Sequence, residues 1–180
     1  LWYNILMAQT YTASAIGATF ANNKSMLGIF NGSGSGRIVR VYRVWVLNNQ
    51  TTGVTGVLTT WALRRTSAQS GGTSITPTKH DTNSESMPAQ VLVATGGTVT
   101  LTGDVSFRNW VWSNDEPAVS SGTSDEFETL VPLNCVWDST GDTTIEPIVL
   151  REGQGISVHH SGSSAVGVAD VYIEYTLAST

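Results

Sequence analysis

The stretch VGVADVYIEYTLAST, residues 166–180, decides the fold class of this chain. Its buried-type side chains recur at every second position, at Ala169, Val171, Ile173, Tyr175 and Leu177. Because successive side chains of a strand point to opposite faces, this pattern predicts a strand with one buried face and one face in water. The same alternation returns along most of the chain, and no segment with a helical period lies between the repeats.

Turn-forming runs such as NGSGSG at residues 31–36 separate the expected strands. The expected strands cover residues 25–30, 37–47, 54–66, 90–94, 98–101, 105–113, 126–132, 134–137, 145–151, 155–160 and 166–178, and the longest loop covers residues 67–87. Many short strands divided by Gly-rich turns are typical of β-sandwiches, jelly rolls and barrels. We therefore predict an all-β fold, a single jelly-roll-like antiparallel β-sandwich at residues 13–180, with an N-terminal arm at residues 1–12.

The composition restricts the partners that we expect. Charged residues make up 13% of the chain, so uncharged polar residues must form much of the surface. Such a surface suits a subunit covered by copies of itself, a secreted or virion protein, or equally a β domain with an uncharged exterior. The net charge of −5 argues against a nucleic-acid partner, which needs a basic stripe. No run reaches the roughly 20 apolar residues of a membrane helix, so we predict no membrane partner.

Three arginines and the single cysteine lead to expectations about where their side chains lie. Arg37, Arg40 and Arg43 are spaced by three in one expected strand, which places Arg40 on the face opposite the other two. We expect these arginines to pair with carboxylates or to lie at an intersubunit contact. The single cysteine, Cys135, lies in the apolar run LVPLNCVW, so we expect a small buried hydrophobe with no internal disulfide.

The first residues, LWYNILM, lack the basic region and long apolar region of a signal peptide. Four large side chains in this run are costly to leave in water: Trp2, Tyr3, Ile5 and Leu6. An arm of this kind either adds a strand to a neighbouring subunit or packs along its own sandwich. Both interpretations stay open.

No arrangement of residues indicates catalysis. His159 and His160 are adjacent in a strand and point to opposite faces, so they do not readily share a metal ion. His80 precedes Asp81 without a recognisable nucleophile motif, and we interpret it as a loop histidine bonded to a nearby Thr and Asp. Acidic residues crowd around one loop, which is typical of a solvated rim or a Ca²⁺ site: Asp115, Glu116, Asp125, Glu126 and Glu128. Asp138 and Asp142 are a second candidate pair for binding a hard cation. Paired carboxylates held in a cleft also hydrolyse glycosides. We predict no catalytic residue, no metal and no cofactor.

Two tryptophans, Trp110 and Trp112, fall on one face of the strand expected at residues 105–113, with Phe107 and Val111 on the other face. A pair of exposed rings on one strand face forms a platform for glycans, and an equivalent pair packs against another sheet or subunit. Both interpretations stay open for these two residues. Trp61, in one of the two longest expected strands, is expected to be core.

The run EPIVLREGQGISV, residues 146–158, has an apolar strand, a charged Gly turn and a second apolar strand. Gly153 and Gly155 are expected to have positive φ in this turn. The run resembles the late hairpin of trimeric jelly rolls of the TNF and C1q type. Together with KSMLGIFNGSGSGRIVRVYRVWVLNNQ, TPTKHDTNSE, WSNDEPA and LVPLNCVWD, it also resembles uncharacterised structural β proteins of tailed-phage virions, of the capsid decoration or cement kind.

That resemblance implies a non-enzymatic structural subunit of a symmetric assembly on the capsid surface of a virion. The expected partners are copies of the chain itself, as a trimer or larger assembly, and a major capsid protein. Two alternatives remain open: an extracellular filament whose subunits donate the N-terminal strand, and a carbohydrate-binding module that uses Trp110 and Trp112.

Overall fold

A computed structural model describes residues 9–49, 57–114, 134–142, 144–162 and 167–179 of the chain. The strands are β1 (Gln9–Thr19), β2 (Lys24–Asn31), β3 (Arg37–Asn48), β4 (Val57–Ser70), β5 (Thr73–Ser74), β6 (Thr78–Lys79), β7 (Val91–Thr95), β8 (Thr98–Asn114), β9 (Asn134–Asp138), β10 (Ile148–Leu150), β11 (Gln154–His160) and β12 (Val168–Ser179). None of the described residues forms a helix of the length and apolarity that a membrane span requires.

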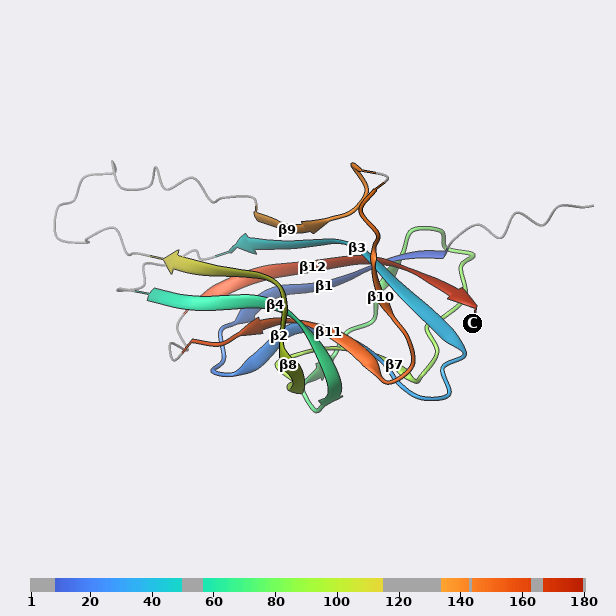
Figure 1. Ribbon diagram of the computed structural model, residues 1–180, viewed down its shortest axis with the longest axis horizontal. Helices are drawn as coiled ribbons and strands as arrows, with labels where there is room; N and C mark the ends of the chain where they lie inside the picture. The colour runs from blue at the N-terminus through green and yellow to red at the C-terminus, as the bar shows by residue number, and fades with distance from the viewer. Residues whose placement is uncertain (1–8, 50–56, 115–133, 143, 163–166, 180) are drawn as a thin grey trace, which may run out of the picture.

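The strands form two antiparallel sheets that pack as a sandwich, which confirms the predicted all-β sandwich class. Sheet A has the order β10-β3-β12-β1-β6, and β9 also pairs with β3. Sheet B has the order β5-β7-β2-β11-β4-β8. Figure 1 shows the sheets as two layers, with β3, β12 and β1 in one layer and β2 and β11 in the other.

The core lies between the two layers and follows from the alternation in the sequence. In β12 the five side chains predicted to face inward are all buried: Ala169, Val171, Ile173, Tyr175 and Leu177. The neighbouring β3 contributes four fully buried side chains, Val39, Val41, Val44 and Val46. Sheet B packs against them with five fully buried side chains, Leu27, Ile29, Leu63, Ile156 and Val158. Each side chain of this size stabilises the fold by about 1.5–3 kcal/mol when it is fully buried, so the facing apolar stripes hold the sheets together.

Several predicted boundaries differ from the observed strands. The predicted arm at residues 1–12 is too long, because Gln9–Thr12 already belong to β1 and pair with β12. The strand β1 was not expected, and the two strands expected at residues 98–101 and 105–113 form one strand, β8. The strand expected at residues 126–132 lies outside the described residues.

The segment predicted as a long loop at residues 67–87 is partly ordered into strands. β4 continues to Ser70, and the short strands β5 and β6 follow it. β5 pairs with β7 of sheet B while β6 pairs with β1 of sheet A, so this segment bridges the two sheets along one side of the sandwich. Together with β7, it lines an open pocket of about 490 Å³ with a largely apolar wall that includes Ile75, Met87 and Val93.

Candidate binding face

The outer face of sheet A is the side turned away from sheet B, and an irregularity in β3 decides which side chains it carries. The buried positions of β3 change phase between Val41 and Val44, where the pairing with β12 shifts register. A β-bulge of this kind adds one residue to a strand and reverses the facing of every later side chain. Arg40 and Arg43 therefore both face outward. The prediction that they lie on opposite faces is wrong because sequence spacing assumes an unbroken strand.

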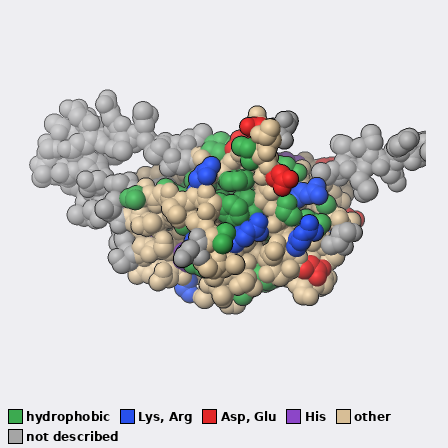
Figure 2. Space-filling view, in the orientation of Figure 1, with side chains coloured by type: hydrophobic (Ala, Val, Ile, Leu, Met, Phe, Trp, Pro, Cys, Tyr) green, Lys and Arg blue, Asp and Glu red, His purple; other side chains and the backbone are tan. Residues whose placement is uncertain are grey.

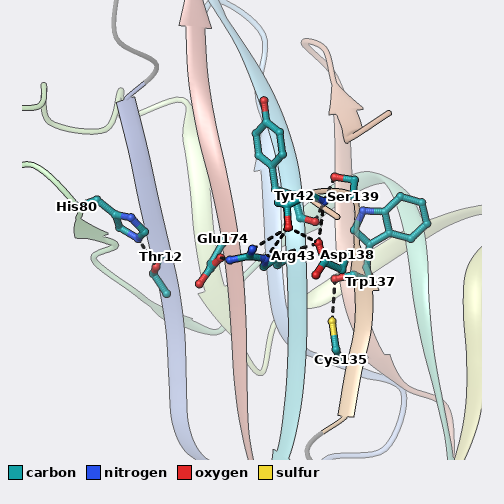
Figure 3. A network of polar contacts seen from close by, with 10 residues as sticks. Thr12, Tyr42, Arg43, His80, Cys135, Trp137, Asp138, Ser139 and Glu174 are labelled. Atoms are coloured by element: carbon teal, nitrogen blue, oxygen red, sulfur yellow. Dashed lines mark hydrogen bonds and ion pairs between the residues drawn. The ribbon is translucent and has the colours of Figure 1, made fainter. Parts of the chain in front are cut away.

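Arg43 is the centre of a polar network on this face (Figure 3). Its Nη1 lies 3.3 Å from Glu174 Oε2 and its Nε lies 3.5 Å from Asp138 Oδ1. Its Nη2 donates to Thr140 Oγ1 at 2.7 Å. The side chains of Arg43, Asp138 and Glu174 are 39%, 40% and 29% exposed, so the network is fixed in geometry and still open to solvent.

Asp138, one of the two carboxylates of this network, is favoured in its charged form. Thr140 donates to Asp138 Oδ1 from both its backbone N–H and its hydroxyl, each at 2.7 Å. These two hydrogen bonds and the nearby Arg43 guanidinium lower the pKa of Asp138. Arg37 pairs in the same way with Glu85, so the expected pairing of arginines with carboxylates is confirmed for Arg37 and Arg43.

An aromatic row lies beside the Arg43 network. Trp45 of β3 is the register partner of Tyr172 of β12, and both side chains are half-buried on the outer face. Beyond this row Asp170 Oδ1 accepts hydrogen bonds from the Gly17 backbone N–H at 2.7 Å and from Asn49 Nδ2 at 2.8 Å. The two aromatic rings therefore lie between fixed polar groups on both sides.

Cys135 lies at the end of the aromatic row, because it is the register partner of Trp45 in β9. The prediction of a buried cysteine is wrong: Val136 and Trp137 of β9 pack against the core, whereas Cys135 is exposed. Its thiol donates to the backbone carbonyl of Trp137 at 3.3 Å. Partial burial, together with the charge of Asp138, raises the pKa of this thiol.

A second cluster, which we call the aromatic edge, lies where β8 of sheet B meets β9 of sheet A; it consists of Phe107, Trp110, Trp137, Arg65 and Arg108. Phe107 and Trp137 make an edge-to-face contact with centroids 5.6 Å apart. The guanidinium of Arg65 lies 5.2 Å from the Phe107 ring centroid, and that of Arg108 lies 5.7 Å from the Trp137 ring centroid. Figure 2 shows hydrophobic side chains gathered in the middle of the face it views, with Lys and Arg around them.

The predicted pair Trp110 and Trp112 is only partly described. Trp110 is half-buried and stacks on the core residue Trp61, with centroids 6.1 Å apart and planes 27° apart. Trp61 is fully buried, which confirms its expected place in the core. The backbone of Trp112 pairs with Thr59, and its side chain lies outside the described part of the structure. The glycan platform at Trp110 and Trp112 stays a prediction.

The histidines take structural positions. His160 is fully buried against Phe20 and Trp61. Its Nδ1 donates to the Ala21 carbonyl at 3.0 Å, which leaves Nε2 to accept from the Thr59 hydroxyl at 2.6 Å. His80 bonds through Nε2 to Thr12 of β1 at 2.8 Å, so its threonine partner comes from a strand far away in the sequence.

Of the acidic residues predicted as cation sites, one pair lies in the described part of the structure and caps turns. Asp138 and Asp142 each accept hydrogen bonds from the residue two positions later, Thr140 and Thr144, and so cap their own turns. Within the described ranges no three His, Cys, Asp or Glu side chains gather as a metal site. The arm residues Trp2, Tyr3, Ile5 and Leu6, and the acids Asp115, Glu116, Asp125, Glu126 and Glu128, lie outside the described residues.

Sequence reasoning missed the outer-face row of Trp45, Tyr172 and Glu174. The alternation Asp170, Tyr172, Glu174 in residues 166–180 already placed three chemistry-bearing side chains on the wet face of one strand. The alternation could not show that β3, which carries Trp45, pairs with this strand. Comparison with protein-family models, curated protein sequences and solved structures finds no match for this chain.

Proposed function

We propose that this chain is a non-enzymatic structural subunit that assembles with copies of itself through the aromatic edge. The observation that carries this proposal is the clustering of Phe107, Trp137, Arg65 and Arg108 at the meeting of the two sheets. Aromatic residues and arginine are enriched at the centres of protein interfaces, where they supply most of the binding energy. Strand β8 of this cluster also carries two exposed apolar side chains, Val105 and Val111, which are 47% and 63% exposed.

The open edge of β8 supports the same interface. β8 pairs with β4 along one side, and no other described strand pairs with it. An unpaired strand edge presents N–H and C=O groups that a strand from another chain can pair with. The N-terminal arm, with anchors Trp2, Tyr3, Ile5 and Leu6, is the strand we propose for this role.

The strand order supports the finer fold within this proposal. Taken in chain order, the eight principal strands are β1, β2, β3, β4, β8, β10, β11 and β12. If these strands are numbered 1 to 8, the order across sheet A is 6-3-8-1 and the order across sheet B is 2-7-4-5. This order supports a jelly roll, the fold of many capsid and ligand-binding assemblies, as the finer description of the sandwich. We propose a jelly roll that forms closed trimers or larger rings.

We further propose that the assembly is the decoration layer of a tailed-phage capsid, with the major capsid protein as its partner on the virion surface. The resemblance of five sequence segments to such proteins is what supports this role. A filament of donated strands is the second candidate, favoured by the same open edge of β8. A head-to-tail contact that does not close gives an open filament, whereas a cyclic contact gives a ring.

The test is the particle mass and shape of the purified protein, measured by multi-angle light scattering and negative-stain imaging. Closed trimers or rings support the decoration subunit, and fibres support the filament. A matched pair of variants locates the interface: Val111→Arg on β8 should abolish assembly, whereas Ile16→Arg, at a position 71% exposed on β1, should not. Deletion of residues 1–8, which leaves β1 intact, should leave a folded subunit that no longer assembles. A monomeric wild type, or normal assembly of Val111→Arg, would contradict the proposal.

A further inference from the structure

We infer that the outer face of sheet A binds a neutral, hydroxyl-rich glycan chain across Trp45 and Tyr172. This site uses a different face from the aromatic edge and does not depend on the proposed assembly. It also differs from the platform predicted at Trp110 and Trp112, because Trp110 packs one ring face against Trp61.

The first step of the argument is the aromatic surface itself. Trp45 and Tyr172 are directly paired on neighbouring strands, so their side chains lie side by side on one face. Both are partly exposed, while the alternate residues Val44, Val46, Val171 and Ile173 fill the core. Sugar rings have an apolar C–H face that packs on an aromatic ring, and two aromatic side chains next to each other on a sheet can contact such a ring without a pocket.

The second step is the polar frame around the rings. Glu174, Arg43 and Asp138 lie on one side of the aromatic row, and Asp170 with Asn49 lies on the other. Each carboxylate is already held by a hydrogen bond or an ion pair, with Glu174 at 3.3 Å from Arg43 and Asp170 at 2.8 Å from Asn49. Fixed acceptors that need no rearrangement are the groups that bind hydroxyl hydrogens at least cost. The distance along β12 from Asp170 to Glu174 is about 14 Å, so the platform has the scale of an oligosaccharide.

The third step is charge, which selects the class of ligand. Among the described residues, this face carries three carboxylates, Asp138, Asp170 and Glu174, and two guanidinium groups, Arg40 and Arg43. The excess of one negative charge disfavours nucleic acid and other polyanions, which require a basic surface. A neutral glycan has no such conflict, and its hydroxyl groups can donate to the carboxylates.

The experiment measures binding of three soluble neutral probes, cellohexaose, maltohexaose and chitohexaose, by isothermal titration calorimetry with the full chain. We expect at least one of them to bind. Trp45→Ala and Tyr172→Ala should each weaken that binding at least about tenfold, the size expected for losing a stacked ring. Tyr172→Phe keeps the ring and should change affinity less than about threefold. Trp110→Phe, which alters the aromatic edge and leaves this face intact, is the matched control and should bind as the wild type does.

A second readout is independent of the variants' stability. A fluorophore attached to Cys135, the register partner of Trp45, should change its emission when the bound probe is added, and the signal should saturate at the same concentration as the heat. No binding by any of the three probes at millimolar concentration would overturn the inference, as would unchanged binding by Trp45→Ala. It would also be overturned if Cys135 reacts in the monomer and is protected in the assembled protein, because the face would then be an interface between copies.

Discussion

The carboxylate of Glu152 accepts a hydrogen bond of 2.9 Å from the backbone N–H of Gly36, and so joins the turn between β10 and β11 to the turn between β2 and β3. The backbone N–H of Gly34 donates to the same carboxylate at 3.1 Å. Gly34 and Gly36 both have positive φ, at 78° and 61°, which turns their N–H groups toward one acceptor. These two donors, Gly34 first, lower the pKa of Glu152.

Glu152→Gln should therefore lower the melting temperature at pH 7. The pKa of Glu152 is lower in the folded than in the unfolded state, so its contribution to stability is present above the unfolded value of about 4.3 and is lost as the pH falls through the folded value. The melting temperatures of Glu152→Gln and the wild type should converge in that acidic range. Glu146→Gln, at a carboxylate for which no such cradle exists in the described residues, is the control. A difference between Glu152→Gln and the wild type that persists unchanged at low pH would contradict the role assigned to the charge.

The two glycines of the β10–β11 hairpin are required for different reasons, and this distinction can be tested. Gly153 has φ of 78°, as predicted, whereas Gly155 does not have positive φ. A Cβ on Gly155 would lie 2.4 Å from Thr66 Oγ1 and 2.7 Å from the Ile29 carbonyl oxygen. Crowding of this kind costs about 1–3 kcal/mol, and positive φ costs about 1–2 kcal/mol for residues other than Gly, less for Asn.

Urea unfolding of four variants separates these two causes. At position 153 we expect Gly153→Asn to be more stable than Gly153→Ala, because Asn adopts positive φ more readily. At position 155 we expect the reverse order, because the larger side chain increases the clash with Thr66 and Ile29. The same order at both positions would mean that the turn, and not the close approach of strands, limits Gly155.

The aromatic core around Trp61 should carry a large share of the stability. Trp61 is fully buried and contacts Phe20 with centroids 5.0 Å apart and His160 with centroids 5.5 Å apart. Trp61→Ala should lower the free energy of unfolding by about 3–5 kcal/mol, measured by urea denaturation. Trp45→Ala removes the same side chain from a half-buried position on the outer face and should cost clearly less. Equal losses would contradict the assignment of Trp61 to the core and Trp45 to the surface.

The sequence was sufficient to predict the sandwich and its inward faces wherever large apolar residues alternate without interruption, as in β12. It was insufficient for β1, because QTYTASAIGAT buries Ala13 and Ala15, whose small side chains give a weak alternation. It also divided β8 in two at Gly103, which has positive φ of 48° inside a continuous strand with several register shifts. A strand continues through such an irregularity because it stays paired with its neighbour, here β4, and the local sequence carries no information about that neighbour.

The candidate site was less predictable than the fold, since it depends on which strands become neighbours. Tyr172 and Glu174 were on the predicted wet face of their strand, and Trp45 was in another strand more than a hundred residues earlier in the chain. Only the pairing of β3 with β12 brings them together, and only the bulge before Val44 turns Arg43 outward. Cys135 was misplaced for a related reason: Val136 and Trp137, which follow it, pack against the core, whereas Cys135 is exposed.

The exposure of Cys135 predicts that the folded protein reacts with iodoacetamide without denaturant. Because the pKa of this thiol is raised, the reaction should be slow near neutral pH and should keep accelerating above the ordinary thiol value of about 8.5. Mass spectrometry of the intact protein against time, at several pH values, measures both properties. Modification that occurs only after unfolding in urea would contradict the exposed position of Cys135 on β9.

The buried histidines predict a loss of stability below neutral pH. His159 and His160 are 4% and 0% exposed, and burial lowers the pKa of each imidazole; the charge of Arg64 adds to this at His159. The unfolded chain, with an imidazole pKa of about 6.5, therefore binds more protons than the folded chain as the pH falls below that value. The free energy of unfolding should be highest above pH 6.5 and should decline as the pH falls through the lower folded values.

Urea denaturation of the wild type at pH 8, 6.5 and 5 tests this prediction, since these values bracket the unfolded imidazole pKa. His159→Gln and His160→Gln should each flatten the decline, and this slope remains informative even where a variant is less stable at every pH. His80→Gln is the comparison variant, because His80 is exposed and bonds to Thr12 on the surface, away from the buried pair. A decline that persists unchanged in both His159→Gln and His160→Gln would contradict a role for the buried pair.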